Sequence, residues 1–342
     1  MRTAVVICPG RGTYGKPELG TLARHFKNHA LLARLDARRT ELGQETLTAL
    51  DSAATYSTGK HTRGDNASAL IYAATIADFA ALQDVEILAV TGNSMGWYSA
   101  LACAGALSPE NGFEVVNTMG TLMQDHLIGG QLIHPFMDDA WHNDPGQKAA
   151  LLALAADINS RSHHSLALSI NLGGMLVLAG NDAGLAAFEA AVPQAQARFP
   201  MRLANHAAFH TALQAPVAAI GRAKLPASLF GQPKYPLIDG RGAIWWPHAT
   251  DTKALCDYTL GHQVTEPYDF THAITIAARE FAPDLFIITG PGTTLGGATA
   301  QALLIAGWQG MASKSDFQSA QQEAPFLISM GMDDQRRLVT GE

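Results

Sequence analysis

The sequence predicts an α/β protein with a largely parallel sheet and a small second domain inserted into the first. Short segments rich in Val, Ile and Leu alternate with Ala- and Leu-rich segments of helical character, which is typical of α/β folds with parallel strands. The predicted strands are residues 4–8, 85–90, 166–172, 175–181 and 285–289, and helices are predicted at 67–82 and 97–107. A segment in the middle of the chain departs from this alternation and indicates the insertion.

The insertion has a strand and helix order of its own. It runs strand (131–137), helix (147–158), strand (166–172), strand (175–181), helix (183–192) and strand (197–203). This βαββαβ order is ferredoxin-like, and Gly173-Gly174 between the central strands predicts a tight hairpin. We therefore expect a cleft for a ligand between two bodies. The predicted division is a large domain at 1–128 and 204–320, a ferredoxin-like subdomain at 129–203, and a C-terminal tail at 321–342.

Composition and charge exclude several functional classes. The 342 residues are 47% hydrophobic and carry a net charge of −7, which argues against disorder and against nucleic-acid binding. No apolar run approaches the ~20 residues of a membrane span, and the first strand begins directly after the N-terminus without a signal-peptide pattern. The three cysteines, Cys8, Cys103 and Cys256, show no metal-binding spacing. These features predict a cytoplasmic protein that has no metal site and contacts no membrane.

The strongest motif is a G-x-S-x-G pentapeptide between a predicted strand and a predicted helix. Gly92-Asn93-Ser94-Met95-Gly96 follows the strand at 85–90 and precedes the helix at 97–107. This context is that of a nucleophile elbow, in which a strained turn presents the serine hydroxyl above the sheet. The pattern predicts an α/β-hydrolase-like large domain with Ser94 as nucleophile. The backbone N–H of Met95 would donate one hydrogen bond to an oxyanion.

The loop after the first strand allows two interpretations. Gly10, Gly12 and Gly15 fit G-x-G-x-x-G, a dinucleotide-binding pattern, and Asp36 lies at a suitable distance. That pattern needs a second strand ending at the acidic residue, whereas residues 31–39 have helical character. We favour the interpretation that the backbone N–H of Arg11 is the second oxyanion donor.

Four segments resemble the malonyl-CoA:acyl-carrier-protein transacylase family and the acyltransferase domains of polyketide and fatty-acid synthases. Residues 92–105, GNSMGWYSALACAG, are similar to the family's G-H-S-L-G-E-Y-S-A-L-x-C-A-G. The inserted subdomain also lies where the family has its small subdomain. The resemblance extends over roughly residues 3–305. The other segments are Pro9-Gly10-Arg11-Gly12, which looks like P-G-Q-G, Ala208-Phe209-His210-Thr211, which looks like the box that holds the family's histidine, and Gly290-Pro291-Gly292.

The resemblance implies a Ser–His dyad and a covalent acyl-serine. Ser94 would be the nucleophile, and His210 would act as general base and then as general acid. In the family a backbone carbonyl orients the histidine, and the matching position is Gln263. The implied reaction moves an acyl group from acyl-CoA to the phosphopantetheine of an acyl carrier protein, in fatty acid or polyketide biosynthesis. Coenzyme A thioester would be a substrate, with no permanently bound cofactor.

Several departures from the family pattern concern the acyl pocket. Met119 stands where malonyl-specific members carry the arginine that binds the free carboxylate. Without that cation a malonyl group is disfavoured, unless Arg11 bends in, and an uncharged acyl group fits better. Asn93, Trp97 and Asp65 also replace family residues, and we expect them to line the acyl pocket.

Three other functions remain open from the sequence. The same dyad could pass the acyl group to water, which would make the protein an acyl hydrolase or editing thioesterase. A catalytically degenerate member could bind a carrier protein without reacting. An ordinary esterase would need a triad acid between Ser94 and His210, and Asp182 lies in that range, although it is expected to cap a helix.

Overall fold

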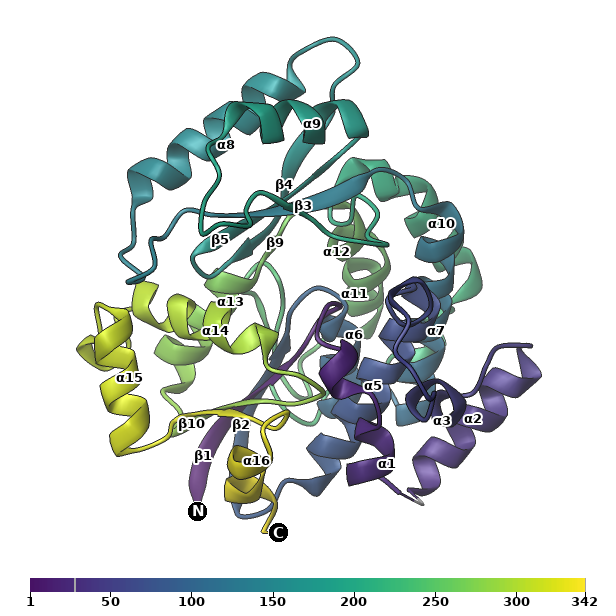
Figure 1. Ribbon diagram of the computed structural model, residues 1–342. Coiled ribbons are helices and arrows are strands. Elements are labelled where there is room, and N and C mark those ends of the chain that lie inside the picture. The colour runs from purple at the N-terminus through teal and green to yellow at the C-terminus, as the bar shows by residue number, and fades with distance from the viewer. Residues whose placement is uncertain (28, 342) are drawn as a thin grey trace.

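The computed structural model describes residues 1–27 and 29–341 and has two α/β bodies, shown in Figure 1. Within these residues the larger body has a six-stranded sheet with the strand order β11-β10-β1-β2-β7-β8. All its neighbouring strands are parallel except the edge pair β7 and β8. The predicted α/β fold with a largely parallel sheet is confirmed. The strands are β1 (Arg2–Cys8), β2 (Val85–Gly92), β7 (Leu237–Ile238), β8 (Ile244–Trp245), β10 (Leu285–Ile288) and β11 (Leu327–Ser329).

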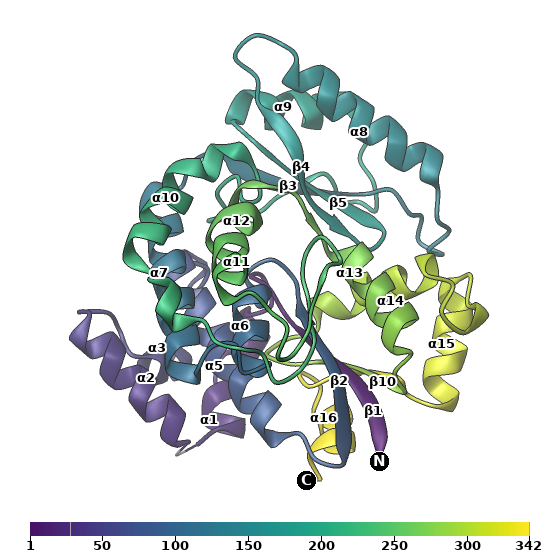
Figure 2. The same cartoon turned by 180° about the vertical axis from the view of Figure 1, so that it is seen from behind.

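Strand β1 is central and buried, because helices cover both sides of the sheet. Helices α13 to α15 lie on one side of β1 and β2, and α1 to α3, α5 and α7 lie on the other, as the opposite views of Figures 1 and 2 show. The carboxyl ends of β1 and β2 meet at one edge, where Cys8 is in register with Gly92. The helices of the larger body are α1 (Thr21–His25), α2 (Ala30–Glu41), α3 (Leu47–Asp51), α4 (Thr58–His61), α5 (Gly64–Ala81), α6 (Gly96–Cys103), α7 (Pro109–His126), α10 (Ala215–Lys224), α11 (Thr252–Asp257), α12 (Gln263–Thr265), α13 (Phe270–Ile276), α14 (Thr294–Ile305), α15 (Lys314–Glu323) and α16 (Asp333–Thr340).

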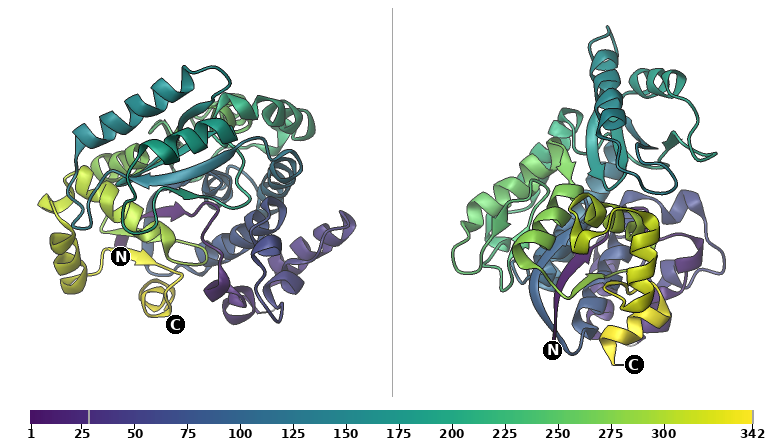
Figure 3. Two further views of the ribbon diagram at one scale, coloured as in Figure 1. Left: turned by 45° about the horizontal axis from the view of Figure 1, so that its top comes forward. Right: turned by 90° about the vertical axis from the view of Figure 1, so that its left-hand side faces the viewer.

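The inserted segment folds into the predicted βαββαβ order. Its sheet has the order β6-β3-β5-β4, with antiparallel ladders, and it stands above the larger body in the right-hand view of Figure 3. Strand β9 (Tyr268–Asp269), from the larger body, extends this sheet by pairing parallel to β4. The inserted elements are β3 (Gly130–Pro135), α8 (Pro145–Asn159), β4 (Leu166–Leu172), β5 (Met175–Gly180), α9 (Asp182–Ala191) and β6 (Met201–Arg202).

The inserted sheet buries different residues on its two faces. Leu132, Leu176 and Leu178 pack with α8 and α9 in a small core of their own. Ile133 and Val177 belong instead to the core of the larger body. This division follows from the alternation of side chains along a strand. One face of the small sheet is therefore available as the wall of a site between the bodies.

Two predicted segments differ in the structure. The strand predicted at 197–203 is reduced to Met201–Arg202, because Gln196 and Ala197 have positive φ angles and Pro200 has no N–H for a ladder. Residues 321–342 were predicted as a tail, yet their described part forms β11 beside β10 and then α16. The buried ion pair of Arg336 with Asp78 joins α16 to α5. Among the described residues, no helix combines the length and apolar character needed to cross a bilayer.

Candidate active site

The turn between β2 and α6 has the geometry of a nucleophile elbow. Ser94 has a φ angle of 56°, a conformation that costs energy for a residue with a side chain. The flanking glycines allow close backbone contacts: a Cβ atom on Gly92 would lie 2.3 Å from Gly96, and one on Gly96 would lie 2.1 Å from the carbonyl oxygen of Cys8. The motif's spacing therefore follows from packing of the turn against the end of β1.

His210 lies directly opposite the Ser94 hydroxyl. The Ser94 Oγ atom is 2.7 Å from His210 Nε2, although the two residues are 116 positions apart. His210 Nδ1 is 2.6 Å from the backbone carbonyl oxygen of Gln263, which can only accept a hydrogen bond. Nδ1 therefore carries the proton, and Nε2 is free to accept the proton of Ser94. Burial lowers the pKa of His210 to about 4, although the Gln263 carbonyl partly opposes this shift, so the imidazole is neutral near pH 7.

The side chain of Gln263 also contacts the elbow. Its Nε2 atom donates to the carbonyl oxygen of Ser94 at 3.0 Å, and its Oε1 atom accepts from the hydroxyl of Tyr98 at 3.1 Å. Gln263 thus contacts the histidine through its main chain and the nucleophile's backbone through its side chain. Tyr268 adds a hydrogen bond of 2.5 Å from its hydroxyl to the carbonyl oxygen of Gly92.

The loop after β1 packs against the elbow. A Cβ atom on Gly10 would lie 2.5 Å from the carbonyl oxygen of Asn93, so only glycine permits this approach. Arg11 and Met95 border the same cavity as Ser94. The Arg11 guanidinium donates through Nη2 to the carbonyls of Thr62, at 2.7 Å, and Asn205, at 2.8 Å. Its side chain therefore joins two distant loops at the border of this cavity.

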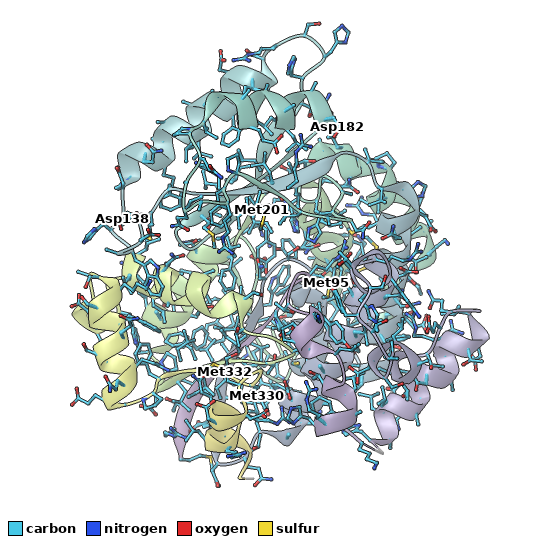
Figure 4. All side chains as sticks on the ribbon, viewed as in Figure 1. Met95, Asp138, Asp182, Met201, Met330 and Met332 are labelled. Atoms are coloured by element: carbon cyan, nitrogen blue, oxygen red, sulfur yellow. The ribbon has the colours of Figure 1, made fainter. Side chains whose placement is uncertain are left out.

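A cavity of about 310 Å³ opens beside Ser94, between the two bodies. One wall is the face of the small sheet that packs toward the larger body, with Ile133 and Val177 among its residues. Methionine side chains are frequent in the lining of this cavity. Two of them, Met95 and Met201, lie near the middle of the molecule in Figure 4. Such flexible, apolar side chains adapt their shape to an apolar ligand. The cavity is lined by Met95, Met119, Met123, Met175 and Met201, five of the ten methionines in the sequence.

The structure brings two of the four predicted pocket residues to this cavity. Met119 and Asn93 line it, and Met119 is fully buried. Trp97 does not line it: its side chain is fully buried elsewhere and donates through Nε1 to Thr259 at 3.0 Å. The reason is geometric, because Trp97 leaves α6 on the face that packs edge-on against Tyr258.

Two acidic residues considered from the sequence also lie away from the cavity. The Asp65 carboxylate pairs with Arg63 at 3.1 Å and is absent from the cavity lining, so the prediction that it lines the pocket is wrong. Asp182 lies on the inserted subdomain, well above Met95 in Figure 4, and its side chain is 99% exposed. It does not orient His210, whose Nδ1 is bound to Gln263, and the cap of α9 is Asn181. No triad with Asp182 is therefore formed.

Sequence reasoning missed the polar groups that support the site. Tyr98 lies within the 92–105 segment but was given no role there, and Tyr268 lies outside the motifs; their partners are 165 and 176 residues away. His206 and Gln131 line the cavity together with Arg198. Within the described residues, no cluster of side chains has the composition of a metal site.

Comparison with known sequences gives distant relatives of one kind. No known family model matches the sequence. The malonyl CoA-acyl carrier protein transacylase of Salmonella typhimurium is 26% identical over 213 residues, and that of Escherichia coli strain K12 shows the same identity. These matches cover 61% of this chain and 64% of each relative, so the chain spans less than two thirds of the curated relatives it matches.

Solved structures show the same fold along nearly the whole chain. A malonyl transacylase from Coxiella burnetii has a TM-score of 0.74 at 15% identity and covers 98% of this chain and 96% of its own. A malonyl-transacylase in complex with a type II polyketide synthase acyl-carrier protein has a TM-score of 0.72 at 18% identity and covers both chains completely. An acyl-carrier-protein S-malonyltransferase from Burkholderia pseudomallei has a TM-score of 0.70 at 23% identity, covering 88% of this chain and 93% of its own.

Fold and site together define a two-body α/β protein with a nucleophile elbow and a histidine held by a main-chain carbonyl. The resemblance found in the sequence is confirmed: the chain is a distant relative of the malonyl-CoA:acyl-carrier-protein transacylase family.

Proposed function

We propose that this protein is a serine acyltransferase that moves an acyl group from acyl-CoA to an acyl carrier protein. The observation that carries the proposal is the hydrogen-bond chain from Ser94 through His210 to the Gln263 carbonyl, beside a cavity of about 310 Å³. Relatives in sequence are named as transacylases of acyl carrier protein, which supports the same reaction type. The three cysteines are free thiols, which suits a reducing cytoplasm.

In the first half-reaction Ser94 Oγ attacks the thioester carbonyl of acyl-CoA while His210 Nε2 takes the hydroxyl proton. The negative charge that develops on the carbonyl oxygen is stabilised by the backbone N–H groups of Arg11 and Met95. The C–S bond then breaks, the proton passes from His210 to the departing sulfur, and coenzyme A leaves. The product is an ester between the acyl group and Ser94.

In the second half-reaction the same residues work in reverse. The phosphopantetheine thiol of the carrier protein gives its proton to His210 and attacks the acyl-Ser94 carbonyl. Collapse of the intermediate breaks the C–O bond and returns the proton to Ser94 Oγ. No permanently bound cofactor is needed, because the thioester supplies the activated acyl group.

The acyl group is proposed to be uncharged. By the sequence resemblance, Met119 matches the position of the family's carboxylate-binding arginine, and its side chain is fully buried. A malonyl carboxylate would lose water there without gaining an ion pair. The Nη2 atom of Arg11 is already bound to two backbone carbonyls and keeps that side of the guanidinium occupied. An apolar cavity of about 150 Å³ accepts benzene. The cavity beside Ser94 is about 310 Å³ and has room for an apolar chain.

Intact-protein mass measurement after mixing with malonyl-, acetyl-, butyryl- and octanoyl-CoA tests this function. We expect a mass gain from an uncharged acyl group, little gain from malonyl-CoA, and none with any donor in Ser94→Ala. Holo acyl carrier protein should then remove the acyl group and gain its mass. Loss of the acyl group to water at the same rate with and without carrier protein would identify an acyl hydrolase instead. Absence of any Ser94-dependent adduct would overturn the proposal.

A further inference from the structure

A chain of buried hydrogen bonds connects the cavity wall to the backbone beside His210. Ser169 Oγ donates to the carbonyl oxygen of Phe209 at 2.8 Å, and Gln131 Nε2 donates to Ser169 Oγ at 2.7 Å. Gln131 Oε1 is 2.8 Å from His206 Nδ1. Ser169 and Gln131 are almost completely buried, whereas His206 lines the cavity. This series of hydrogen bonds thus begins at the Phe209 carbonyl and ends at the His206 imidazole in the cavity wall.

The direction of these bonds fixes the tautomer of His206. The Phe209 carbonyl can only accept, so the Ser169 hydroxyl must donate to it and must accept from Gln131. The Gln131 atom facing Ser169 is therefore the amide nitrogen, and the one facing His206 is the amide oxygen. His206 Nδ1 must then carry the proton. In the neutral ring this leaves an unprotonated Nε2, which makes no hydrogen bond within residues 1–27 and 29–341.

His206 is held neutral by its surroundings. Burial and the positive charge of Arg11 lower its pKa well below the ordinary histidine value. Arg11 and His206 both contact the ring of Phe209, with the guanidinium carbon 5.4 Å and the imidazole 5.7 Å from the ring centre. A second positive charge beside Arg11 is disfavoured, so His206 stays a hydrogen-bond acceptor near neutral pH.

We propose that His206 Nε2 is a specificity-determining acceptor that selects an acyl group bearing a hydroxyl. This inference rests on the proposed acyltransferase function and adds the substrate class to it. In the apolar cavity a hydroxyl can donate to Nε2, whereas an unsubstituted chain leaves this acceptor without a partner. A site with a buried polar group discriminates against ligands that cannot pair with it.

The acceptor character of His206 separates a hydroxyl from a ketone. A ketone oxygen has no proton to donate, so it would meet the Nε2 lone pair without forming a hydrogen bond. If the guanidinium of Arg11 were the recognising group, a ketone would be accepted at least as well as a hydroxyl. The relative rates for hydroxy- and oxo-substituted chains therefore report which of the two groups recognises the substituent.

The test measures the rate of Ser94 acylation by intact-protein mass for octanoyl-CoA, its 2-, 3- and 4-hydroxy derivatives and 3-oxooctanoyl-CoA. We expect one hydroxyoctanoyl derivative to react about five- to tenfold faster than octanoyl, as one neutral hydrogen bond implies. The 3-oxo derivative should react no faster than octanoyl-CoA. His206→Phe should abolish the hydroxyl preference, so that the ratio of the hydroxyoctanoyl rate to the octanoyl rate falls to about one. His126→Phe, a surface substitution at the end of α7, is the matched control and should keep the preference.

Positioning by the hydrogen-bond chain is tested separately. Ser169→Ala frees the Gln131 amide to turn, so the hydroxyl preference should fall although His206 is intact. Nitrogen-15 NMR of the free protein, before any acylation, should show His206 protonated at Nδ1 and unprotonated at Nε2. Equal rates for all the octanoyl derivatives, or a proton on Nε2, would overturn the inference while leaving the acyltransferase proposal standing. Absence of acylation by every donor would overturn both.

Discussion

The Sδ atom of Met119 occupies the space in which a side chain at position 221 would begin. A Cβ atom added to Gly221 would lie 2.6 Å from this sulfur, well inside van der Waals contact. Met119 is on α7 and Gly221 is on α10, so the Met119 side chain is accommodated by a glycine on a different helix. The place of the Met119 side chain, which lines the cavity, therefore depends on glycine at position 221.

Gly221→Ala is expected to lower the free energy of unfolding by about 1 kcal/mol, and by about 2 kcal/mol at most, although alanine favours helices. The gain in helix propensity is about 1 kcal/mol at most, whereas overpacking costs about 1–3 kcal/mol. Thermal or urea unfolding measures the net change. The control is Gly297→Ala on α14, where an added Cβ atom meets nothing within 4 Å. That variant should be neutral or more stable, and equal effects at both sites would contradict the packing argument.

Met119→Arg should shift the preference of the enzyme toward malonyl-CoA. A guanidinium in the cavity can pair with the malonyl carboxylate, and a hydrogen bond to a charged group contributes about 1.5–3 kcal/mol. The ratio of malonyl to octanoyl acylation should therefore rise about tenfold or more. The free protein should lose stability, since the charge is buried without a partner. Met119→Leu conserves volume and should leave the ratio unchanged; an unchanged ratio in Met119→Arg would show that this position does not control the substrate.

In the pH profile of the acylation rate, the midpoint of the acid limb should lie near pH 4 and not near the ordinary histidine pKa. Burial lowers the pKa of His210 to about 4, and only the neutral imidazole can take the proton of Ser94. The rate of Ser94 acylation should thus be nearly constant from pH 8 to pH 5 and fall below that. Rates from stopped reactions across this range, with stability checked by circular dichroism, measure the limb. A midpoint at pH 6 or above would show that His210 is more hydrated than its contacts indicate.

The same shift makes stability depend on pH in a defined direction. The pKa of His210 is lower in the folded protein than in the unfolded chain, so the unfolded chain binds the proton first as the pH falls. This residue's contribution to stability is therefore present above about pH 6.5. It is lost progressively down to the folded-state value of about 4.

Gln263→Leu should lower kcat about tenfold with a smaller effect on KM. The substitution keeps the backbone carbonyl that orients His210 but removes the side-chain bonds to Ser94 and Tyr98. Each lost hydrogen bond contributes about 1 kcal/mol. Because Nδ1 of His210 keeps its partner, the acid limb should not move. Gln263→Glu can still accept the hydrogen bond from Tyr98 but cannot donate to the Ser94 carbonyl. If its kcat lies between those of the wild type and Gln263→Leu, the loss of kcat in Gln263→Glu is due to the bond to the Ser94 carbonyl. A shifted acid limb in Gln263→Leu would contradict this division of roles.

The elbow was predictable from the sequence because its requirements are local. Gly92 and Gly96 stand at fixed distances from Ser94, and a strand and a helix flank them. The inserted βαββαβ unit was predictable for the same reason, since strand and helix periodicities are local patterns. His210, by contrast, could be singled out only through its resemblance to a family box.

The residues that line the cavity were less predictable because the lining depends on how elements distant in the sequence face each other. Trp97 and Met119 both occupy positions matched to the family, yet α6 directs Trp97 toward Thr259 while α7 directs Met119 into the cavity. Asp65 was expected in the pocket, but Arg63, two residues earlier, binds its carboxylate. The link between Gln131 and His206 joins residues 75 positions apart, and no motif contains both.

The backbone carbonyl that holds His210 is a dipole without a net charge. A carboxylate in its place would stabilise the imidazolium form, whereas the carbonyl gives that form little support. A proton taken from Ser94 is therefore held weakly and is passed on quickly. A sulfur leaving group needs little help from this proton, because thiols ionise near pH 8.5 and can depart as thiolates. An amide nitrogen, by contrast, must be protonated before it departs. A histidine held by such a carbonyl therefore suits acyl donors whose leaving group departs as a stable thiolate.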